Sequence, residues 1–442
     1  MNLLRIHFVR CALSLVCCLF ALGACAPPPP PQPTPTAPMS PTSVPTATLA
    51  PTATPLPPTP IPAPPALTLW VAEAEPALTT VRALAATFAA TKGVTLTVVA
   101  RPPDALRLSL ATAALNGDPL PDLLWADGET LAGLLTDERL QPISAANFPA
   151  DALPALRTAA TADGKLWGLP VAASGALLLY YNRALITTVP TTSDELIVRA
   201  RAATTPEVAG LVMAWDEVRW VLPWLYAFGG APTSADGQTI TLDTPAMTAT
   251  LNLLRELYTT APNDGASYTR GQRLFTQGYA ALSIDGDWSL APYRAVSATL
   301  DLGIAPLPVV PATGRVAAPT LNGTYLMLSR ALAGKPLAEG LAFGAFLAEP
   351  ATQARLATEL RRLPATRSAL VAPGSPWAAD PALAAAATSA AEAPGLPPTV
   401  AVRCALDGID LWLPSLLKGS LAPAKAPATM QREAEACLAR SS

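Results

Sequence analysis

Carboxylates and tryptophans follow apolar runs in this chain of 442 residues, and this pairing indicates what chemistry it can perform. Trp125 and Asp127 close the run Leu-Leu-Trp-Ala-Asp, and Asp287 and Trp288 follow a second run that ends at Asp285. Such runs predict strands that are buried on both faces of a sheet. Ligands of open α/β sheets bind outside the carboxyl ends of the strands. Aromatic rings and carboxylates at these ends are suited to a polar solute with flat apolar faces.

The scarcity of histidine restricts the enzymatic chemistry that this chain can perform. The one histidine, His7, lies in a segment that we expect to be removed. Histidine general bases, Ser-His-Asp and Cys-His systems and histidine-ligated zinc are therefore excluded. Asp285 and Asp287 lack the further oxygen ligands of a calcium loop, so we expect no metal and no cofactor. The remaining enzymatic alternative is a glycosidase that acts through Glu217 and Asp287.

Composition and charge point to a large globular body that does not bind nucleic acid. Hydrophobic residues make up 51 % of the sequence, and the formal net charge is −3. Nucleic-acid binding needs a basic face, which this composition does not favour. The length allows two or three domains.

The first 24 residues are predicted to be a secretory signal peptide. Arg5 and Arg10 precede an apolar run at 11–22 that is too short to span as a stop-transfer helix. The run ends in Leu-Gly-Ala-Cys, which matches the cleavage box of bacterial lipoproteins, so Cys25 would become the acylated first residue. An ordinary leader cut elsewhere is the alternative. We therefore expect a lipid anchor at the outer face of the cell membrane.

Residues 25–65 are predicted to be the lipidated cysteine and a linker. Residues 26–65 hold 18 prolines and no charge, with Thr, Ala and Ser between them. Such a segment cannot bury a core, and it favours polyproline-like extension. We interpret it as a spacer that holds the following domain away from the membrane, with a Pro-rich docking motif as the alternative.

The cysteines that remain after removal of the leader are Cys25, Cys404 and Cys437. An exported chain works in an oxidising compartment, where disulfides form and persist. We predict a disulfide between Cys404 and Cys437, with two separate buried thiols as the alternative.

Strands and helices alternate from about residue 66 onward. The ranges 67–71 and 94–99 are predicted strands, and 77–91 is an amphipathic helix between them. This β-α-β order implies a parallel sheet with covering helices, and hence an α/β fold. Further helices are predicted at 105–115, 195–203, 215–228, 245–258, 337–347, 350–359 and 428–439.

Several segments carry patterns that occur together in one family. The longest is DGKLWGLPVAASGALLLYYNRALI at 163–186, and RLFTQGYAALSIDGDWSL at 273–290 carries a Gly-x-Trp signature. The others are GDPLPDLLWADGETLAGLLTDERLQPI, WDEVRWVLPWLYAFGG, LGIAPLPVVPATGR and RRLPATRSAL. In their order along the chain, these segments resemble the extracellular solute-binding proteins of ABC importers, and most closely the branch that binds maltose and maltodextrin.

The resemblance implies a two-lobed fold of the periplasmic-binding-protein type II, with a central ligand cleft and a hinge of several strands. Lobe 1 would comprise residues 67–172 and 319–367, and lobe 2 residues 174–316 and 372–442. The hinge would include Val171, Ala172 and Gly175, and the lobes would close on the ligand.

The resemblance also implies a set of ligand contacts. Trp288 takes the place of the family's Gly-x-Trp aromatic ring, and the remaining candidates lie in other matching segments. These candidates are Trp125, Asp127, Glu217, Arg219, Trp220 and Trp412.

Three departures argue against maltodextrin itself as the ligand. The loop at 72–75 lacks the family's Asp-Lys pair, Gly175 or Ser174 stands where a ligand carboxylate would be, and Leu416 replaces an arginine.

The sequence therefore predicts a monomeric, membrane-anchored binding protein that captures a sugar or oligosaccharide and delivers it to the permease of an ABC transporter. The first alternative is a binder of a polyamine, thiamine or a phosphorylated polyol. The others are the surface glycosidase and a ligand-sensing partner of a membrane receptor.

Overall fold

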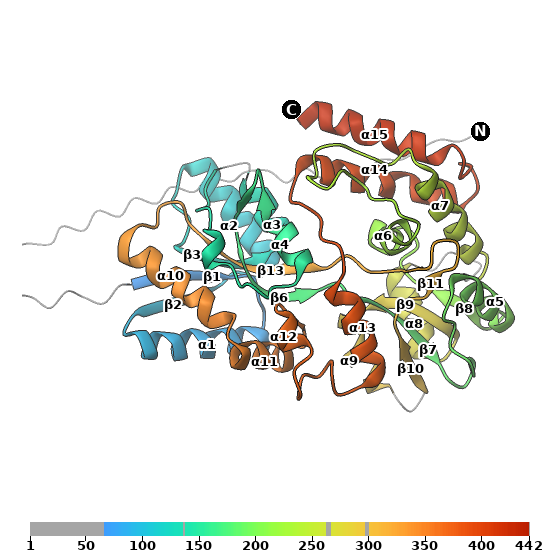
Figure 1. Ribbon diagram of the computed structural model, residues 1–442, viewed down its shortest axis with the longest axis horizontal. Helices are drawn as coiled ribbons and strands as arrows, with labels where there is room; N and C mark the ends of the chain where they lie inside the picture. The colour runs from blue at the N-terminus through green and yellow to red at the C-terminus, as the bar shows by residue number, and fades with distance from the viewer. Residues whose placement is uncertain (1–65, 136–137, 262–266, 297–299, 442) are drawn as a thin grey trace, which may run out of the picture. The chain divides into compact units, whose positions relative to one another are not determined.

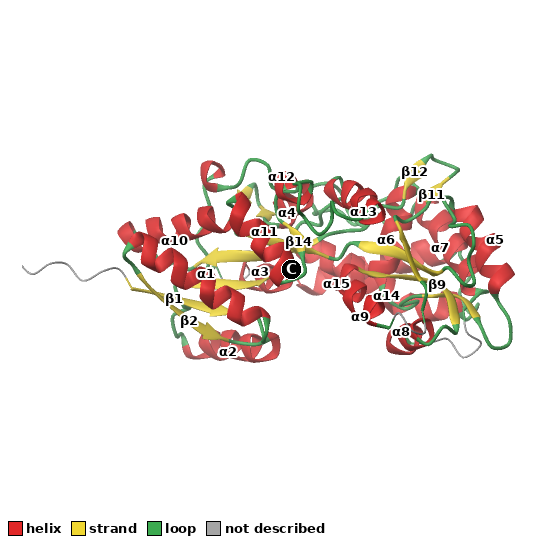
Figure 2. Ribbon diagram, turned by 90° about the horizontal axis from the view of Figure 1, so that it is seen from below, coloured by secondary structure: helices red, strands yellow, loops and turns green. Residues whose placement is uncertain are grey.

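The computed structural model describes residues 66–441 except 136–137, 262–266 and 297–299. The predicted signal peptide, the lipid attachment at Cys25 and the proline-rich linker lie outside these residues. The described chain contains two sheets, each covered by helices (Figures 1 and 2). None of its helices is long and apolar enough to cross a membrane.

The first sheet contains six strands in the order β14-β6-β13-β3-β1-β2. β1 (Ala66–Val71) runs parallel to β2 (Thr95–Ala100) and β3 (Leu123–Asp127), which confirms the predicted β-α-β opening around α1 (Ala77–Lys92). β13 (Asn322–Leu328) returns from late in the chain and pairs antiparallel with β3 and with β6 (Leu169–Ser174). β14 (Leu363–Pro364) adds a short antiparallel edge to β6.

The helices of this half surround the first sheet. α1 packs on β2, α10 (Gly334–Leu347) on β1, β6 and β13, and α11 (Pro350–Glu359) on β6. The shorter elements are α2 (Pro103–Asn116), α3 (Gly128–Leu135), η1 (Ala145–Asn147), α4 (Pro154–Ala159), the hairpin β4–β5 (Thr161–Ala162 and Lys165–Leu166) and α12 (Arg367–Leu370). Figure 1 shows α10 in orange beside the blue α1, although their first residues, 334 and 77, are 257 positions apart in the sequence.

The second sheet contains four strands in the order β10-β7-β9-β8. β9 (Ala280–Gly286) is buried along its whole length, between β7 (Leu177–Asn182) and β8 (Ala209–Val212). β10 (Leu302–Ala305) is the other edge. α5 (Ser193–Ala203) packs on β8, and α8 (Tyr268–Thr276) packs on β8 and β9.

A helical layer completes the second half of the chain. α14 (Val400–Leu417) and α15 (Ala426–Ser441) pack on each other and on α7 (Pro245–Tyr258), and α14 also packs on α6 (Val218–Ala227). The bounds of α7 agree with the prediction, because Thr244 caps its first turn and Pro245 is its first residue. The remaining elements are η2 (Asp287–Ser289), α9 (Leu290–Ala295), the pair β11–β12 (Val309–Val310 and Arg315–Val316) and α13 (Pro381–Ala391).

Three chain segments cross from one half to the other. The first is the connection from β6 to β7 at Gly175 and Ala176, the second is 317–321 before β13, and the third leads from α12 through α13 to α14. α13 packs on β10 of the second sheet and on α12 of the first half. The structure thus has two lobes joined by several crossings of the chain, and the two-lobed fold is confirmed.

A disulfide joins α14 to α15 through Cys404 and Cys437, which are 33 residues apart. Cys404 is completely buried in the core of the second lobe. The bond therefore fixes the helical pair on the second lobe.

We expect Cys404→Ala combined with Cys437→Ala to lower the free energy of unfolding by about 3 kcal/mol, because the unfolded chain regains the entropy of an open loop. Urea unfolding of the oxidised wild type and the double variant measures this difference. Reductant should lower the midpoint of the wild type and leave that of the double variant unchanged. Equal midpoints for the oxidised wild type and the variant would contradict the expectation.

Candidate functional site

Trp288 is a half-exposed ring that hydrogen bonds hold in place at the end of β9. It lies in the turn η2 with 41 % of its surface exposed, and its Nε1 donates to the hydroxyl of Tyr268 at 2.6 Å. Trp220 packs edge-on behind it, with the ring centroids 6.3 Å apart, and also contacts the ring of Tyr268. Trp288 therefore presents a fixed apolar face to solvent, which is the feature that a flat polar solute needs.

A buried carboxylate, Asp285, binds Tyr268, the hydrogen-bond partner of Trp288. Its oxygens accept hydrogen bonds from Tyr268 at 2.8 Å, from Tyr293 at 2.5 Å and from Gln272 at 3.1 Å. Burial raises the pKa of Tyr268 to about 12, and burial beside Asp285 raises the pKa of Tyr293 above its ordinary value. Both hydroxyls therefore keep their protons at neutral pH and act as donors.

Asp287 connects this group to the first crossing of the chain. Its Oδ1 accepts the backbone N–H of Gly175 at 3.0 Å, and its own backbone N–H donates to the carbonyl of Ala176 at 2.9 Å. The side chain is 6 % exposed, and burial raises its pKa to about 6, although Arg362 and Arg219 act in the opposite direction. Asp287 is therefore a buried carboxylate that faces guanidinium groups from both lobes.

The first lobe contributes a second polar cluster, which follows β1. Glu73 is buried and accepts two hydrogen bonds from Arg362, at 2.6 and 3.0 Å. The indole Nε1 of Trp125 donates to the same carboxylate at 3.2 Å, and Arg362 also donates to the hydroxyl of Thr324. A carboxylate, a guanidinium and a hydroxyl thus lie together at the carboxyl ends of β1 and β3, where the topology predicts a ligand.

Two predicted residues of α6, Arg219 and Trp220, lie beside Trp288. The guanidinium carbon of Arg219 lies 5.8 Å from the centroid of the Trp288 ring. Glu217 precedes the helix, and burial and then Asp216 raise its pKa. Trp220 is 2 % exposed and donates to the carbonyl of Ile284, so it supports the site from behind.

The structure corrects the prediction that Trp125 offers a face to the ligand. Trp125 is 0 % exposed, because β3 is buried on both faces, and its indole supports Glu73 instead. Asp127 is exposed and accepts from the backbone N–H of Thr130, which places it at the start of α3. Trp412 is partly buried in α14, and its Nε1 has no hydrogen-bond partner.

The three predicted hinge residues differ in position. Val171 and Ala172 lie inside β6 and are buried, whereas Gly175 lies in the connection between β6 and β7. Gly175 has a φ of 96°, which favours glycine. The backbone of the first crossing turns at this residue.

Sequence reasoning missed six polar residues that complete the site. The signal for Asp285 was present, because a carboxylate at the end of a wholly apolar run needs partners when it is buried. Nothing local indicates the others, whose partners are distant in the sequence. These residues are Glu73, Arg362, Tyr268, Gln272 and Asn322.

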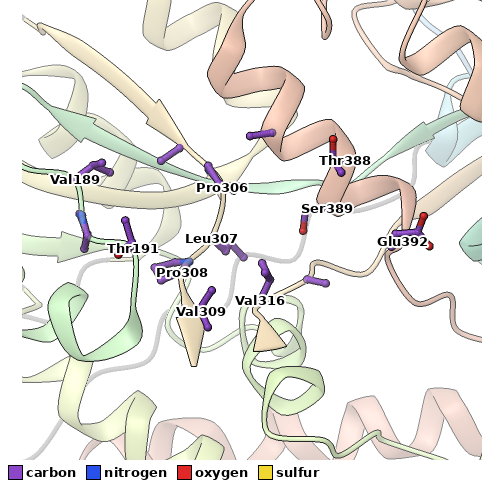
Figure 3. A pocket seen from close by; sticks show the side chains of 14 residues that line it. Val189, Thr191, Pro306, Leu307, Pro308, Val309, Val316, Thr388, Ser389 and Glu392 are labelled. Atoms are coloured by element: carbon purple, nitrogen blue, oxygen red, sulfur yellow. The ribbon is translucent and has the colours of Figure 1, made fainter. Parts of the chain in front are cut away.

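A cavity of about 580 Å³ lies elsewhere in the structure and shares no residue with this site (Figure 3). Its lining comes from the segment before α5, the segment from β10 to β11 and α13, with Glu392 as the one charged residue. Pro306, Leu307 and Pro308 face it. An apolar lining of this kind is not suited to a solute ringed by hydroxyl groups.

We expect Arg362→Leu to lower the free energy of unfolding by about 3 kcal/mol, because it leaves the carboxylate of Glu73 buried without its partner. The matched control is Arg355→Leu, which removes an exposed helical pair with Glu359 and should cost less than about 0.5 kcal/mol. Urea unfolding measures both. Equal losses in the two variants would show that Glu73 does not depend on Arg362.

Asp287 should make stability depend on pH. Because its folded pKa of about 6 lies above the unfolded value, the native state binds more protons between these two values. The contribution of Asp287 to the free energy of unfolding is therefore fully present at low pH and is lost as the pH rises through about 6. The unfolding free energy of the wild type minus that of Asp287→Asn should fall as the pH rises from 4.5 to 7.5, with a slope of up to about 1.4 kcal/mol per pH unit.

The control for this titration is Asp104→Asn, which changes a fully exposed carboxylate at the start of α2. Its difference from the wild type is the baseline against which the Asp287 difference is compared. A flat difference for Asp287→Asn would contradict a raised pKa.

Comparisons with known proteins agree with the two-lobed fold. The family model described as "Bacterial extracellular solute-binding protein" matches residues 83–385. The maltodextrin-binding protein MdxE of Bacillus subtilis (strain 168) is 27 % identical over 233 residues, which cover 50 % of this chain and 55 % of that protein. The maltotriose-binding protein of Pyrococcus abyssi (strain GE5 / Orsay) is 26 % identical over 208 residues, which cover 44 % and 43 %. The chain thus spans about half the length of the curated relatives it matches.

Solved structures match more of the chain. The maltose/maltodextrin-binding domain MalE from Bdellovibrio bacteriovorus, bound to maltotriose, has a TM-score of 0.66 at 25 % identity and covers 84 % of this chain and 99 % of that one. A cyclo/maltodextrin-binding protein complexed with maltotetraose has a TM-score of 0.74 at 23 % identity, with 87 % and 98 % covered, and shows the fold. Because the family model covers more than half of the sequence, the chain belongs to the bacterial extracellular solute-binding proteins, which act outside the cytoplasm and are not enzymes.

Proposed function

We propose that the protein captures a sugar or oligosaccharide and delivers it to the permease of an ABC transporter. The observation that carries the proposal is Trp288, a half-exposed ring held by Tyr268 and Asp285. Sugars have apolar faces that stack on such rings and hydroxyl groups that bind carboxylates and guanidinium groups. Relatives named for binding maltodextrin and maltotriose support the same class of ligand.

Polar groups from both lobes would complete the capture. On the second lobe Arg219 lies beside Trp288 and Glu217 lies near Arg219, and Glu73 with Arg362 lies on the first. Asp127 and Trp412 are proposed as further contacts at the periphery. A ligand that touches both clusters would favour closure of lobe 1 (67–172 and 319–367) on lobe 2 (174–316 and 372–442).

The proposal includes an anchor and a partner. Acyl chains on Cys25 would hold the monomeric protein at the outer face of the membrane, and the linker up to residue 65 would give the lobes reach. The permease of an ABC transporter would receive the solute. A radiolabelled fatty acid that is incorporated into the wild type and not into Cys25→Ala would test the anchor.

The ligand is best sought by thermal unfolding against maltose, maltotriose, other oligosaccharides, amino acids, polyamines, thiamine and phosphorylated polyols. A ligand at 100 times its Kd stabilises the native state by about 2.7 kcal/mol and raises the midpoint visibly. We expect a shift with one class of sugar. A shift with a charged solute alone would favour the alternative binders, and turnover of a sugar would favour a glycosidase.

We expect Trp288→Ala to weaken sugar binding by at least about 10-fold, because the stacking face is lost, and Trp288→Phe to keep part of the affinity. The matched control is Tyr279→Ala, which removes a ring of similar exposure, 51 %, whose side chain is not part of the site. Isothermal titration of the three variants with the sugar found above measures the effect. Equal affinities for Trp288→Ala and the wild type would exclude Trp288 as the stacking ring.

A further inference from the structure

Arg219 binds across the two lobes, and this contact gives it a role other than ligand contact. With the amide of Asn322 oriented so that its oxygen faces the guanidinium, Nη1 and Nη2 of Arg219 donate to that oxygen at 3.0 and 2.8 Å. Arg219 lies in α6 of the second lobe, whereas Asn322 is the first residue of β13 in the sheet of the first lobe. One guanidinium therefore connects a helix of one lobe to a strand of the other.

The same guanidinium touches the first crossing of the chain as well as the second. A Cβ atom at position 175 would lie 3.0 Å from Nη1 of Arg219, so the glycine leaves the space that the guanidinium fills. Asn322 pairs with Ser174 in the sheet, directly beside this glycine. Arg219 is thus packed where the segments 174–176 and 320–322 run side by side.

A second hydrogen bond joins the first crossing to the turn that carries Trp288. Asp287 accepts the N–H of Gly175, and it directly precedes Trp288. The ring that would stack on the ligand is therefore joined to the first crossing by Asp287, and the adjacent Arg219 is joined to the second by Asn322. We name the pair of contacts Arg219–Asn322 and Asp287–Gly175 the hinge clasp.

The electrostatics of Arg219 favour this role. Among the described residues, no carboxylate lies within ion-pair distance of its guanidinium, and burial lowers its pKa. The side chain is partly buried, and a guanidinium that loses water needs good acceptors, so the amide oxygen of Asn322 is its principal partner. Removing that acceptor would release Arg219. It would also break one of the two contacts that position Trp288 relative to the first lobe.

We propose that Arg219 and Asn322 are positioning residues that set the geometry of the two ligand-contacting clusters relative to each other. This inference rests on the proposed capture of a solute between the lobes. A positioning role differs from a direct ligand contact in one respect. The effect of Arg219 on affinity then depends on its contact with Asn322.

The first test is a double-mutant cycle measured by isothermal titration of the full chain with maltotriose. Asn322→Leu and Arg219→Met should each weaken binding about 10-fold, and the double variant should be no weaker than either alone, because both remove one interaction. Asn322→Asp should restore binding to within about 2-fold of the wild type, since a carboxylate accepts from guanidinium at least as well as an amide. The control Asn147→Leu changes an exposed asparagine outside the clasp and should bind like the wild type.

The second test needs no ligand. Hydrogen exchange followed by mass spectrometry should show peptides 171–180 and 319–328 exchanging about 10-fold faster in Asn322→Leu than in the wild type, with α1 unchanged. Unchanged exchange in both peptides, or equal acceleration in α1, would overturn the clasp. Additive losses in the titration would also overturn it, because they indicate that Arg219 contacts the ligand independently.

The two tests separate the clasp from the proposed function. If the wild type does not bind maltotriose while the exchange result is as expected, the clasp stands and the choice of sugar fails. If maltotriose binds and neither exchange nor affinity depends on Asn322, the proposed function stands and the clasp is wrong.

Discussion

The burial of two carboxylates at the end of β9 is the constraint on which the site depends. Asp285 is 1 % exposed and Asp287 is 6 % exposed, and a buried carboxylate is unstable without donors. The donors come from α8, α9 and the first crossing, so elements that are far apart in the chain must meet at this point. The exposed ring of Trp288 follows directly and takes its position from the same donors.

The first lobe satisfies the same constraint differently. Glu73 is buried after β1, and an arginine 289 residues later neutralises it. The second lobe uses neutral hydroxyl and amide donors for Asp285, which come from Tyr268, Tyr293 and Gln272. Facing each other, the two lobes offer a paired guanidinium on one side and hydroxyl-supported carboxylates on the other. Under the proposed function, a solute with many hydroxyl groups would contact both lobes.

Local patterns predicted the elements that depend on local physics. The apolar stripe and the Thr244 cap predicted α7, and the apolar run at 280–286 predicted a buried strand with Trp288 at its end. The resemblance to a family predicted the two-lobed fold. The same burial that predicts β3 argues against an exposed Trp125, since a residue inside a strand buried on both faces cannot reach solvent.

The contacts that sequence reasoning missed join residues from distant segments. Arg362 reaches Glu73, and Asn322 reaches Arg219, only after β13 and β14 have joined the first sheet. No periodicity reports such a meeting, because the pairing depends on tertiary packing. Residues that are buried, polar and isolated in apolar runs are the one local signal, and Asp285 is the example here.

The disulfide between α14 and α15 has a consequence for the timing of maturation. Thiols stay reduced in the cytosol and pair in oxidising compartments, so the cross-link can form only after the chain has left the cytosol. Before export, the two helices that cover α7 are held by noncovalent contacts alone. The newly made chain is therefore easier to unfold for translocation than the mature protein. Outside the cytosol, the covalent bond makes the folded protein harder to unfold.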